Sequence, residues 1–205
     1  MKANWFIALM PNTDTDISDL ISTAPTPLRR FVRKDWHITL AFLGPCSAED
    51  AMAAWQYACQ NPPFIQTLTP CSLKAMGHPK KPSAASILFA NGDGIKEWML
   101  KYRSDILKQA KRPPAKYPPM PHLTIARPKR RAPEKTRIEM SHWCKETALC
   151  LPNMVCSKMA LYTWNEDRRE QLFQVIHEMS LTYGCSEENC TGHNQEWERC
   201  TTNGF

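Results

Sequence analysis

Two short segments of the chain each pair a histidine with a threonine two residues later. His37 and Thr39 form the first pair, and His122 and Thr124 form the second, 85 positions further along. Both segments read His-x-Thr-x-Ala-x. Because residues i and i+2 of a β-strand point to the same side, each segment would present one imidazole and one hydroxyl on one face. Apolar side chains would occupy the other face.

Two such strands, brought together across a cleft, could act on a single reacting group. Near neutral pH, modest pKa changes leave one histidine neutral and another protonated. The neutral imidazole would accept a proton from water, the imidazolium would donate one to a leaving alkoxide, and the threonine hydroxyls would bind an anion between them. This arrangement suits metal-free, in-line displacement at phosphorus. Alternatively, each histidine is a hydrogen-bonded residue of a half-buried strand, an interpretation that the repetition of the motif disfavours.

Positive charge is concentrated around the second segment. Residues 108–137 contain ten lysines and arginines and one acid, Glu134, so this window carries a net charge of +9. Such a cluster is either a solvated surface or a binding site for a polyanion. Its overlap with His122 favours phosphate contacts, which read no bases and weaken with salt. The candidates for backbone contact to a nucleic acid are Arg30, Lys129, Arg130 and Arg131.

Alternating strands and helices surround the two segments. The pattern predicts strands at residues 4–10, 35–43, 64–76, 83–90, 122–127, 154–163 and 171–181, and helices at residues 16–24, 47–60, 95–107 and 133–147. Each histidine segment occupies one predicted strand. We therefore predict an α+β fold of two pseudo-symmetric lobes, with antiparallel sheets around a central cleft.

The composition suits one folded domain. The chain has 205 residues, 42% of them hydrophobic, which is enough for a packed core. Its apolar stretches are shorter than the roughly 20 residues of a membrane span, and its beginning does not resemble a secretory signal. We therefore expect a cytoplasmic monomer with reduced thiols. Residues 1–182 should form one bilobal domain and residues 183–205 a flexible, cysteine-containing tail, with no metal and no other cofactor.

Residues 37–44 and 121–127 resemble the two signature motifs of the two-histidine (2H) phosphoesterase superfamily. Within it, the chain most resembles the RNA 2′,3′-cyclic phosphodiesterases, also called 2′-5′ RNA ligases, over about residues 3–182. The resemblance implies an active site in the central cleft and hydrolysis of 2′,3′-cyclic phosphate ends to 2′-phosphomonoesters. It also implies reversible 2′-5′ ligation. The partner would be RNA with such an end, or a small cyclic nucleotide.

The same resemblance implies roles for individual residues. His122 would be the base that activates water and His37 the acid that protonates the 3′-oxygen, although the near symmetry of the motifs permits the reverse. Thr39, Thr124 and Arg127 would hold the phosphate. Strict alternation along a strand puts Arg127 on the face opposite His122, so Arg127 reaches the site only if the strand ends or twists there.

Phe42 occupies the position in the first motif that Arg127 occupies in the second. We expect Phe42 in the core, with stacking on a base as the alternative. Two other functions remain open. One is a two-histidine phosphodiesterase for cyclic ADP-ribose phosphate or 2′-5′ oligoadenylate, and the other is a non-catalytic module that binds RNA or a nucleotide. Intact histidines and threonines in both motifs count against the second of these.

Overall fold

The computed structural model describes residues 3–129 and 131–183, and its framework is an eight-stranded sheet. All strand pairs are antiparallel, and the order is β10-β9-β1-β3-β7-β6-β5, with β2 also paired to β7. The strands of this sheet are β1 (Asn4–Met10), β2 (Leu28–Arg30), β3 (Ile38–Pro45), β5 (Pro70–His78), β6 (Lys81–Phe89), β7 (His122–Pro128), β9 (Lys158–Trp164) and β10 (Phe173–Ser180). A separate two-stranded sheet pairs β4 (Gln66–Leu68) with β8 (Met154–Cys156).

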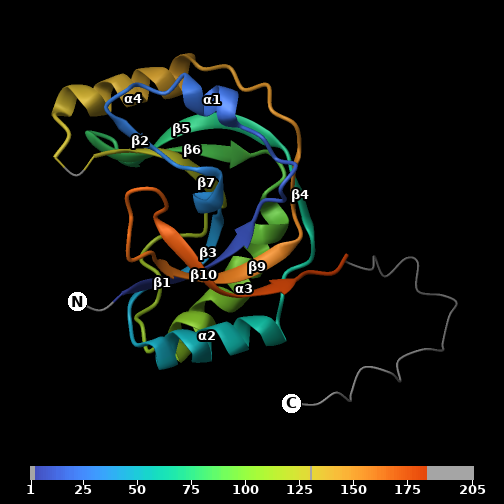
Figure 1. The fold of residues 1–205 in the computed structure, drawn as a ribbon. Helices are drawn as coiled ribbons and strands as arrows, with labels where there is room; N and C mark the ends of the chain where they lie inside the picture. Colours follow the sequence, from blue (N-terminus) through green and yellow to red (C-terminus); the bar gives the residue numbers. More distant parts are fainter. Residues whose placement is uncertain (1–2, 130, 184–205) are drawn as a thin grey trace, which may run out of the picture.

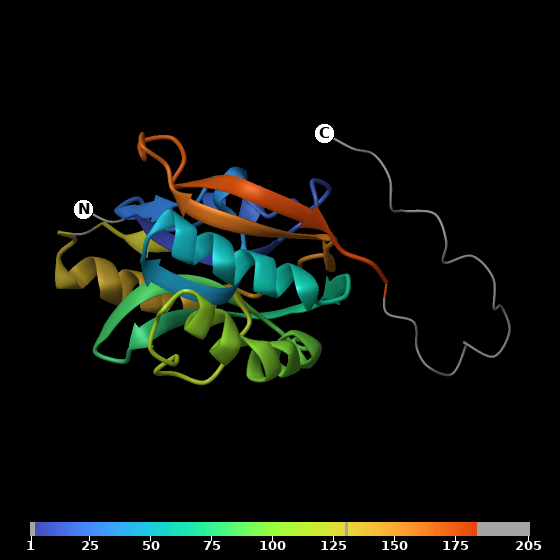
Figure 2. The same ribbon diagram turned by 90° about the horizontal axis from the view of Figure 1, so that it is seen from below.

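The helices divide between the two halves of the large sheet. They are α1 (Ser18–Ser22), α2 (Ala48–Gln60), α3 (Asp93–Gln109) and α4 (Glu134–Glu146), with a 3-10 turn, η1, at Arg33–Asp35. In Figure 1, α1 and α4 lie at the β5–β6 end of the molecule and α2 and α3 at the opposite end. Figure 2, seen from below, shows α2 and α3 lying side by side. The half formed by β10, β9, β1 and β3 meets the half formed by β7, β6, β5 and β2 where β3 pairs with β7.

The core follows the apolar residues that the sequence pattern identifies. Strand β1 is buried from Trp5 to Leu9, and the three apolar residues Ile95, Trp98 and Met99 turn the same face of α3 inward. Helix α2 begins where Ser47 caps it, since the Ser47 hydroxyl accepts the Asp50 backbone N–H at 3.1 Å. Among the described residues, no helix combines the length and apolar character that crossing a membrane requires.

The predicted α+β class is confirmed, and most predicted elements lie where the pattern put them. Two differences stand out, and the first of them affects the site. The sheet is continuous from one half to the other, because β3 and β7 pair directly, although only through Ile38 and Leu123. The strands predicted over residues 64–76 and 154–163 are each divided, the first into β4 and β5 and the second into β8 and β9, and the two parts of each belong to different sheets. The predicted tail, from residue 184 onward, lies outside the described residues.

Candidate active site

The two histidine segments are neighbours at the centre of the sheet. Strands β3 and β7 run antiparallel with Ile38 paired to Leu123, and both of these side chains are fully buried. The histidines and threonines on either side of this pair point to the other face, because side chains alternate along a strand. Both motifs therefore present their polar groups on one face of the sheet. Figure 1 shows β3 and β7 side by side, where the two halves of the sheet join.

The register gives this junction an approximate two-fold axis. An offset of 85 residues carries Ile38 onto Leu123, its own partner, so the axis passes between these two residues. One step along each strand sets His37 across from Thr124. By the same symmetry, His122 lies across from Thr39. Directly opposed side chains in an antiparallel pair are near neighbours, so the four polar groups form one cluster.

Each imidazole is oriented by a backbone carbonyl two residues earlier. His37 Nδ1 lies 2.7 Å from the carbonyl oxygen of Asp35, and His122 Nδ1 lies 2.7 Å from that of Met120. A carbonyl oxygen can only accept, so Nδ1 must carry the proton in both rings. This fixes the tautomer and leaves Nε2 of each neutral imidazole with a lone pair. Both rings are thus prepared to accept or deliver a proton through Nε2.

Aromatic side chains from three strands surround His37. Its ring centroid lies 4.6 Å from that of Phe6 on β1, 5.6 Å from that of Tyr162 on β9 and 5.2 Å from that of Phe173 on β10. Burial lowers the pKa of His37 to about 4, and the positive charges of Arg127 and His122 act in the same direction. At neutral pH His37 is therefore uncharged in the ligand-free protein. This charge state differs from the protonated acid that the motif resemblance implies.

The rings of Phe6, Tyr162 and Phe173 form an aromatic wall around His37, and Asp35 anchors part of it. Asp35 is not among the site residues predicted from the sequence. Its buried carboxylate accepts the backbone N–H of Leu172 at 2.8 and 3.0 Å and that of Phe173 at 3.1 Å. Burial raises the pKa of Asp35, while these hydrogen bonds and the charge of Arg29 oppose the rise. One residue thus orients His37 through its carbonyl and anchors Phe173 through its side chain. The only sequence signal is an acid placed just before an apolar strand.

The two threonines differ in their hydrogen bonding. The Thr124 hydroxyl lies 3.1 Å from that of Ser86 on β6, and both side chains are buried. Thr39 instead pairs with Ala8 on β1, which offers no side-chain partner. The Ser86 contact orients the Thr124 hydroxyl, so Ser86 is a second positioning residue that sequence reasoning missed.

A β-bulge follows the threonine in each motif strand. The pairing of β3 with β1 passes over Leu40, and the pairing of β7 with β6 passes over Ile125, two positions that are again 85 residues apart. An extra residue of this kind shifts the alternation of the side chains beyond it. Arg127 consequently reaches the motif face, where its charge acts on His37. Strict alternation, which placed Arg127 on the far face, fails because of the bulge.

Phe42, expected in the core, is instead 58% exposed. It follows the Leu40 bulge just as Arg127 follows the Ile125 bulge. Beyond Phe42, Gly44 has φ +67°, a conformation that disfavours a side chain, and a Cβ there would lie 3.6 Å from the Phe42 ring. The expectation of a core position was wrong, because the apolar motif around Phe42 does not reveal that the strand turns it outward.

The basic residues predicted to contact the backbone of a nucleic acid have different surroundings in the structure. The Arg30 guanidinium donates to the carbonyl oxygens of Ser22 at 3.1 Å and Ala24 at 2.6 Å, where α1 ends, so this group is already used within the fold. Its neighbour Arg29, pointing to the other side of β2, lines a pocket instead. Lys129 lines the same pocket.

The remaining two basic candidates are Arg130 and Arg131. Arg131 is exposed and lines neither of the pockets described in the structure. Arg130 lies outside the described residues. The structure therefore places Lys129 in one pocket with Arg127, whose charge acts on His37, and it leaves Arg131 on the surface.

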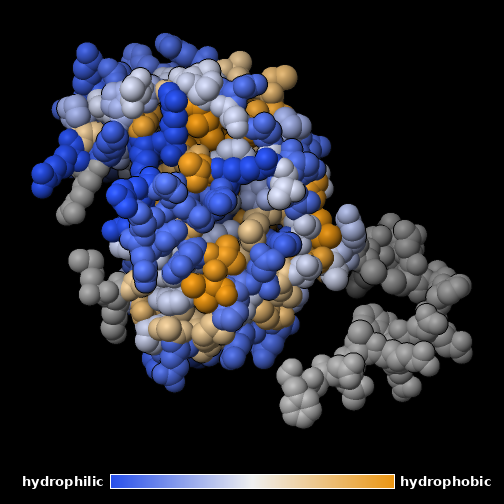
Figure 3. Space-filling model, in the orientation of Figure 1, coloured by the Kyte–Doolittle hydropathy of each residue, from blue (hydrophilic) through white to orange (hydrophobic). Residues whose placement is uncertain are grey.

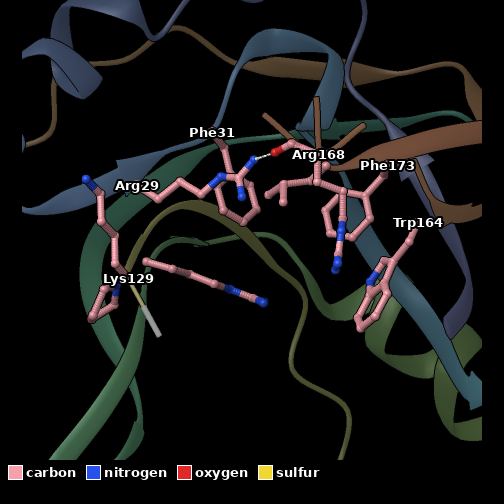
Figure 4. Close-up of a pocket in the computed structure, with 9 residues that line it drawn as sticks. Arg29, Phe31, Lys129, Trp164, Arg168 and Phe173 are labelled. Carbon is pink, nitrogen blue, oxygen red and sulfur yellow. Dashed lines mark hydrogen bonds between the residues drawn. The ribbon is translucent and has the colours of Figure 1, made fainter. Parts of the chain in front are cut away.

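The pocket has a volume of about 420 Å³ and lies between β2, β7 and the connection from β9 to β10. Figure 4 shows Arg29, Phe31, Trp164 and Arg168 around it, with the Arg29 guanidinium donating to the Arg168 carbonyl oxygen. Phe173 belongs both to the pocket and to the wall around His37. In residues 3–129 and 131–183, no three His, Cys, Asp or Glu side chains come together in a way that could hold a metal ion.

No family model and no curated protein matches the sequence. Solved structures do match the fold. A phosphoesterase crystal structure is 19% identical, covers 88% of this chain and 99% of its own, and gives a TM-score of 0.62. E. coli LigT complexed with 3′-AMP is 17% identical over 89% of this chain and 99% of its own, also with a TM-score of 0.62. The TT0787 protein of Thermus thermophilus is 14% identical over 88% of this chain and 98% of its own, with a TM-score of 0.57.

These similarities extend over nearly the whole length of each matched structure and over 88–89% of this chain. Sequence identities below one fifth support a statement about fold and nothing finer. The chain therefore has the α+β fold of LigT-like two-histidine phosphoesterases.

Proposed function

We propose that this chain is a metal-independent phosphodiesterase that hydrolyses RNA 2′,3′-cyclic phosphate ends to 2′-phosphomonoesters. We assign the reaction to residues 1–182, with His37 and His122 as the catalytic pair. The observation that carries the proposal is the matched orientation of the two imidazoles. Each has its Nδ1–H bound to a carbonyl at 2.7 Å, and each therefore keeps Nε2 for proton transfer.

The reaction needs one base and one acid on opposite sides of the phosphorus. The base removes a proton from water as the water oxygen bonds to phosphorus, the bond from phosphorus to the 3′-oxygen breaks, and the acid delivers its proton to that oxygen. Water is consumed, and the proton count balances between the two imidazoles. Thr39, Thr124 and Arg127 bind the non-bridging oxygens, whose charge grows in the transition state. A ribose 5′-hydroxyl in place of water would give the 2′-5′ ligation by the same steps.

The charge of His37 in the free protein bears on which histidine is the base and which is the acid. With a pKa of about 4, His37 is neutral in the free protein and ready to act as the base. As the acid, it would have to gain a proton together with the phosphate, whose negative charge favours the imidazolium. Both cases require one proton shared between the two imidazoles, so kcat/KM has the same dependence on pH in either case. The neutral state of His37 in the free protein favours the first case, in which His37 is the base.

The decisive experiment is incubation with a nucleoside 2′,3′-cyclic phosphate in the presence of EDTA, with the product isomer identified by phosphorus NMR. We expect a 2′-monophosphate and no loss of rate relative to a metal-supplemented reaction. A 3′-monophosphate would contradict the regiochemistry, and loss of activity in EDTA would contradict the metal-independent mechanism. Tight binding without turnover, unchanged in a double variant of the two histidines, would favour a non-catalytic binding module.

A second substrate class is favoured by the neighbouring structures, since E. coli LigT has been crystallised with 3′-AMP, NADP⁺ and ATP. The same two histidines could cleave another nucleotide, such as cyclic ADP-ribose phosphate or 2′-5′ oligoadenylate. Comparing kcat/KM for these compounds with that for a short RNA carrying a cyclic phosphate end separates the two substrate classes. Our proposal requires the RNA to be the better substrate.

A further inference from the structure

The pocket beside His37 gathers positive charge that the fold does not neutralise. Four of its nine lining residues are cations and none is an acid; the cations are Arg29, Arg127, Lys129 and Arg168. Within residues 3–129 and 131–183, none of the four forms an ion pair with a carboxylate. One of the four, Arg29, acts on a buried carboxyl outside the pocket, since its charge opposes the rise in the pKa of Asp35. Four like charges lining one hollow repel one another, which favours an anionic ligand.

Aromatic rings hold two of these guanidinium groups in position. Arg127 lies over the ring of Phe31 at 5.5 Å, and Arg168 lies over the ring of Trp164 at 4.6 Å. A ring face attracts the cation without using its N–H groups as a carboxylate would. The Arg29 guanidinium meanwhile donates to the Arg168 carbonyl oxygen, which ties β2 to the connection between β9 and β10 (Figure 4). The donors are therefore arranged before a ligand arrives, which reduces the entropy cost of binding.

This pocket adjoins the histidine site. The ring of Phe173 lies 5.2 Å from that of His37 on one side and 6.3 Å from that of Phe31 on the other. Arg127 is shared, since it lines the pocket and its charge also acts on His37. In Figure 3 strongly hydrophilic side chains gather on this face, where β2, β7 and the β9–β10 connection meet. A ligand at the histidines could therefore extend directly into the pocket.

We infer that the pocket beside His37 is a second phosphate subsite, which binds a phosphate on the 5′ side of the nucleotide that carries the cyclic phosphate. The inference rests on the proposed function. In a 2′,3′-cyclic phosphate end both the 2′- and the 3′-oxygen belong to the ring, so any further phosphate of the substrate lies on the 5′ side. That group is either the 5′-monoester of a mononucleotide or the phosphodiester of an RNA chain. The protein should accordingly prefer substrates with two phosphate groups.

Binding of reaction products tests the subsite without requiring turnover. Isothermal titration calorimetry in EDTA should compare adenosine 2′-monophosphate with adenosine 2′,5′-bisphosphate. A second phosphate that receives charged hydrogen bonds should tighten binding by about tenfold or more. Raising the salt concentration should reduce this preference, because the subsite acts mainly through charge. Equal affinities for the two products, or no binding of either, would overturn the inference.

Two neighbouring arginines provide a matched pair of variants. Arg168→Ala removes a pocket cation and should bring the ratio of the two affinities close to one. Arg169→Ala makes the same change of charge one residue further along, where the side chain pairs with Asp167 at 2.6 Å outside the pocket, and it should keep the preference. Arg168→Lys should keep part of it. A preference that survives Arg168→Ala, or that both alanine variants reduce equally, would contradict a specific subsite.

Turnover separates this inference from the proposed function. Adenosine 2′,3′-cyclic phosphate, its 5′-phosphorylated form and the dinucleotide ApA with a cyclic phosphate end should be compared by kcat/KM. We expect the plain nucleotide to be the poorest substrate, mainly through a higher KM. The relative rates of the other two identify the second group as a monoester or a diester. If none is hydrolysed while the bisphosphate preference persists, the proposed function fails and the subsite stands.

Discussion

Strands β3 and β7 carry the same motif in opposite halves of the sheet, and they surround it differently. Their shared features are a histidine whose Nδ1 binds the carbonyl two residues earlier, a threonine on the same face, and a bulge directly after that threonine. In β3 the carbonyl belongs to the buried Asp35, and three aromatic rings enclose the imidazole. In β7 the carbonyl belongs to Met120, which is 47% exposed.

This difference separates what a motif specifies from what its neighbours specify. The tautomer and direction of each imidazole come from local backbone geometry, so the two strands share them. The low pKa of His37 comes from burial among side chains on β1, β9 and β10, which the motif does not include. Burial thus lowers the proton affinity of His37, the kind of perturbation by which an environment assigns an acid or base role.

The largest expected effect comes from removing either imidazole. His37→Ala and His122→Ala should each lower kcat on a 2′,3′-cyclic nucleotide by about 10³-fold, because each deletes one of the two proton transfers. His142→Ala, on the exposed face of α4, is the matched control and should leave kcat unchanged. Steady-state kinetics with thermal melts checks both rate and folding. An unchanged kcat in either variant would show that the histidine removed does not carry one of the two proton transfers.

Asp35 and Met120 provide the carbonyl groups that orient the two histidines. Removing their side chains should have unequal effects on the free energy of unfolding. Asp35→Ala strips the acceptor from the backbone N–H groups of Leu172 and Phe173 and should lower the free energy of unfolding by about 2–4 kcal/mol. Met120→Ala removes a half-exposed side chain and should lower it by less than about 1 kcal/mol. Urea denaturation measures both values. Similar losses in the two variants would show that Asp35 does not anchor β10 as described.

Stability should fall on acidification because of His37. Its pKa in the folded protein, about 4, lies below the ordinary value of 6.5, so between these pH values the unfolded chain binds a proton that the folded chain excludes. Lowering the pH from 6.5 to 4 should therefore reduce the free energy of unfolding by up to about 3 kcal/mol from this residue. His37→Gln should lack that part of the decrease. Denaturation curves of the two proteins at several pH values measure this difference. An equal loss of the free energy of unfolding in both proteins between pH 6.5 and 4 would refute the low pKa of His37.

The smallest predicted effect concerns the threonine hydroxyls. Ser86→Ala leaves Thr124 without its hydrogen-bond partner and should lower kcat by about 2- to 10-fold. Ala8→Ser would give Thr39 a comparable partner from β1, and it should change kcat less, since Thr39 is not held in this way at present. Kinetics on the cyclic nucleotide measures both. An unaltered rate for Ser86→Ala would mean that the Thr124 hydroxyl needs no support.

The sequence was sufficient to predict the α+β class, most element positions and the pairing of polar and apolar faces at both motifs. Spacing of two residues along a strand is a local property, and it survives folding. The face of the sheet on which Arg127 lies could not be predicted from the sequence, because it depends on a bulge that arises in the pairing of β7 with β6. The pocket was equally hidden, since it joins Arg29, Lys129 and Trp164 from three distant segments. Phe42 was misplaced because an apolar motif does not reveal which position turns outward.

The claim that both imidazoles meet one phosphate can be tested directly by NMR of ¹⁵N-labelled histidine side chains during titration with adenosine 2′-monophosphate. We predict that the signals of His37 and His122 shift together with one dissociation constant, and that the pKa of His37 rises from about 4 as the anion binds. Assignment comes from the two single histidine variants. A response confined to one ring, or absent from both at saturation, would contradict the account.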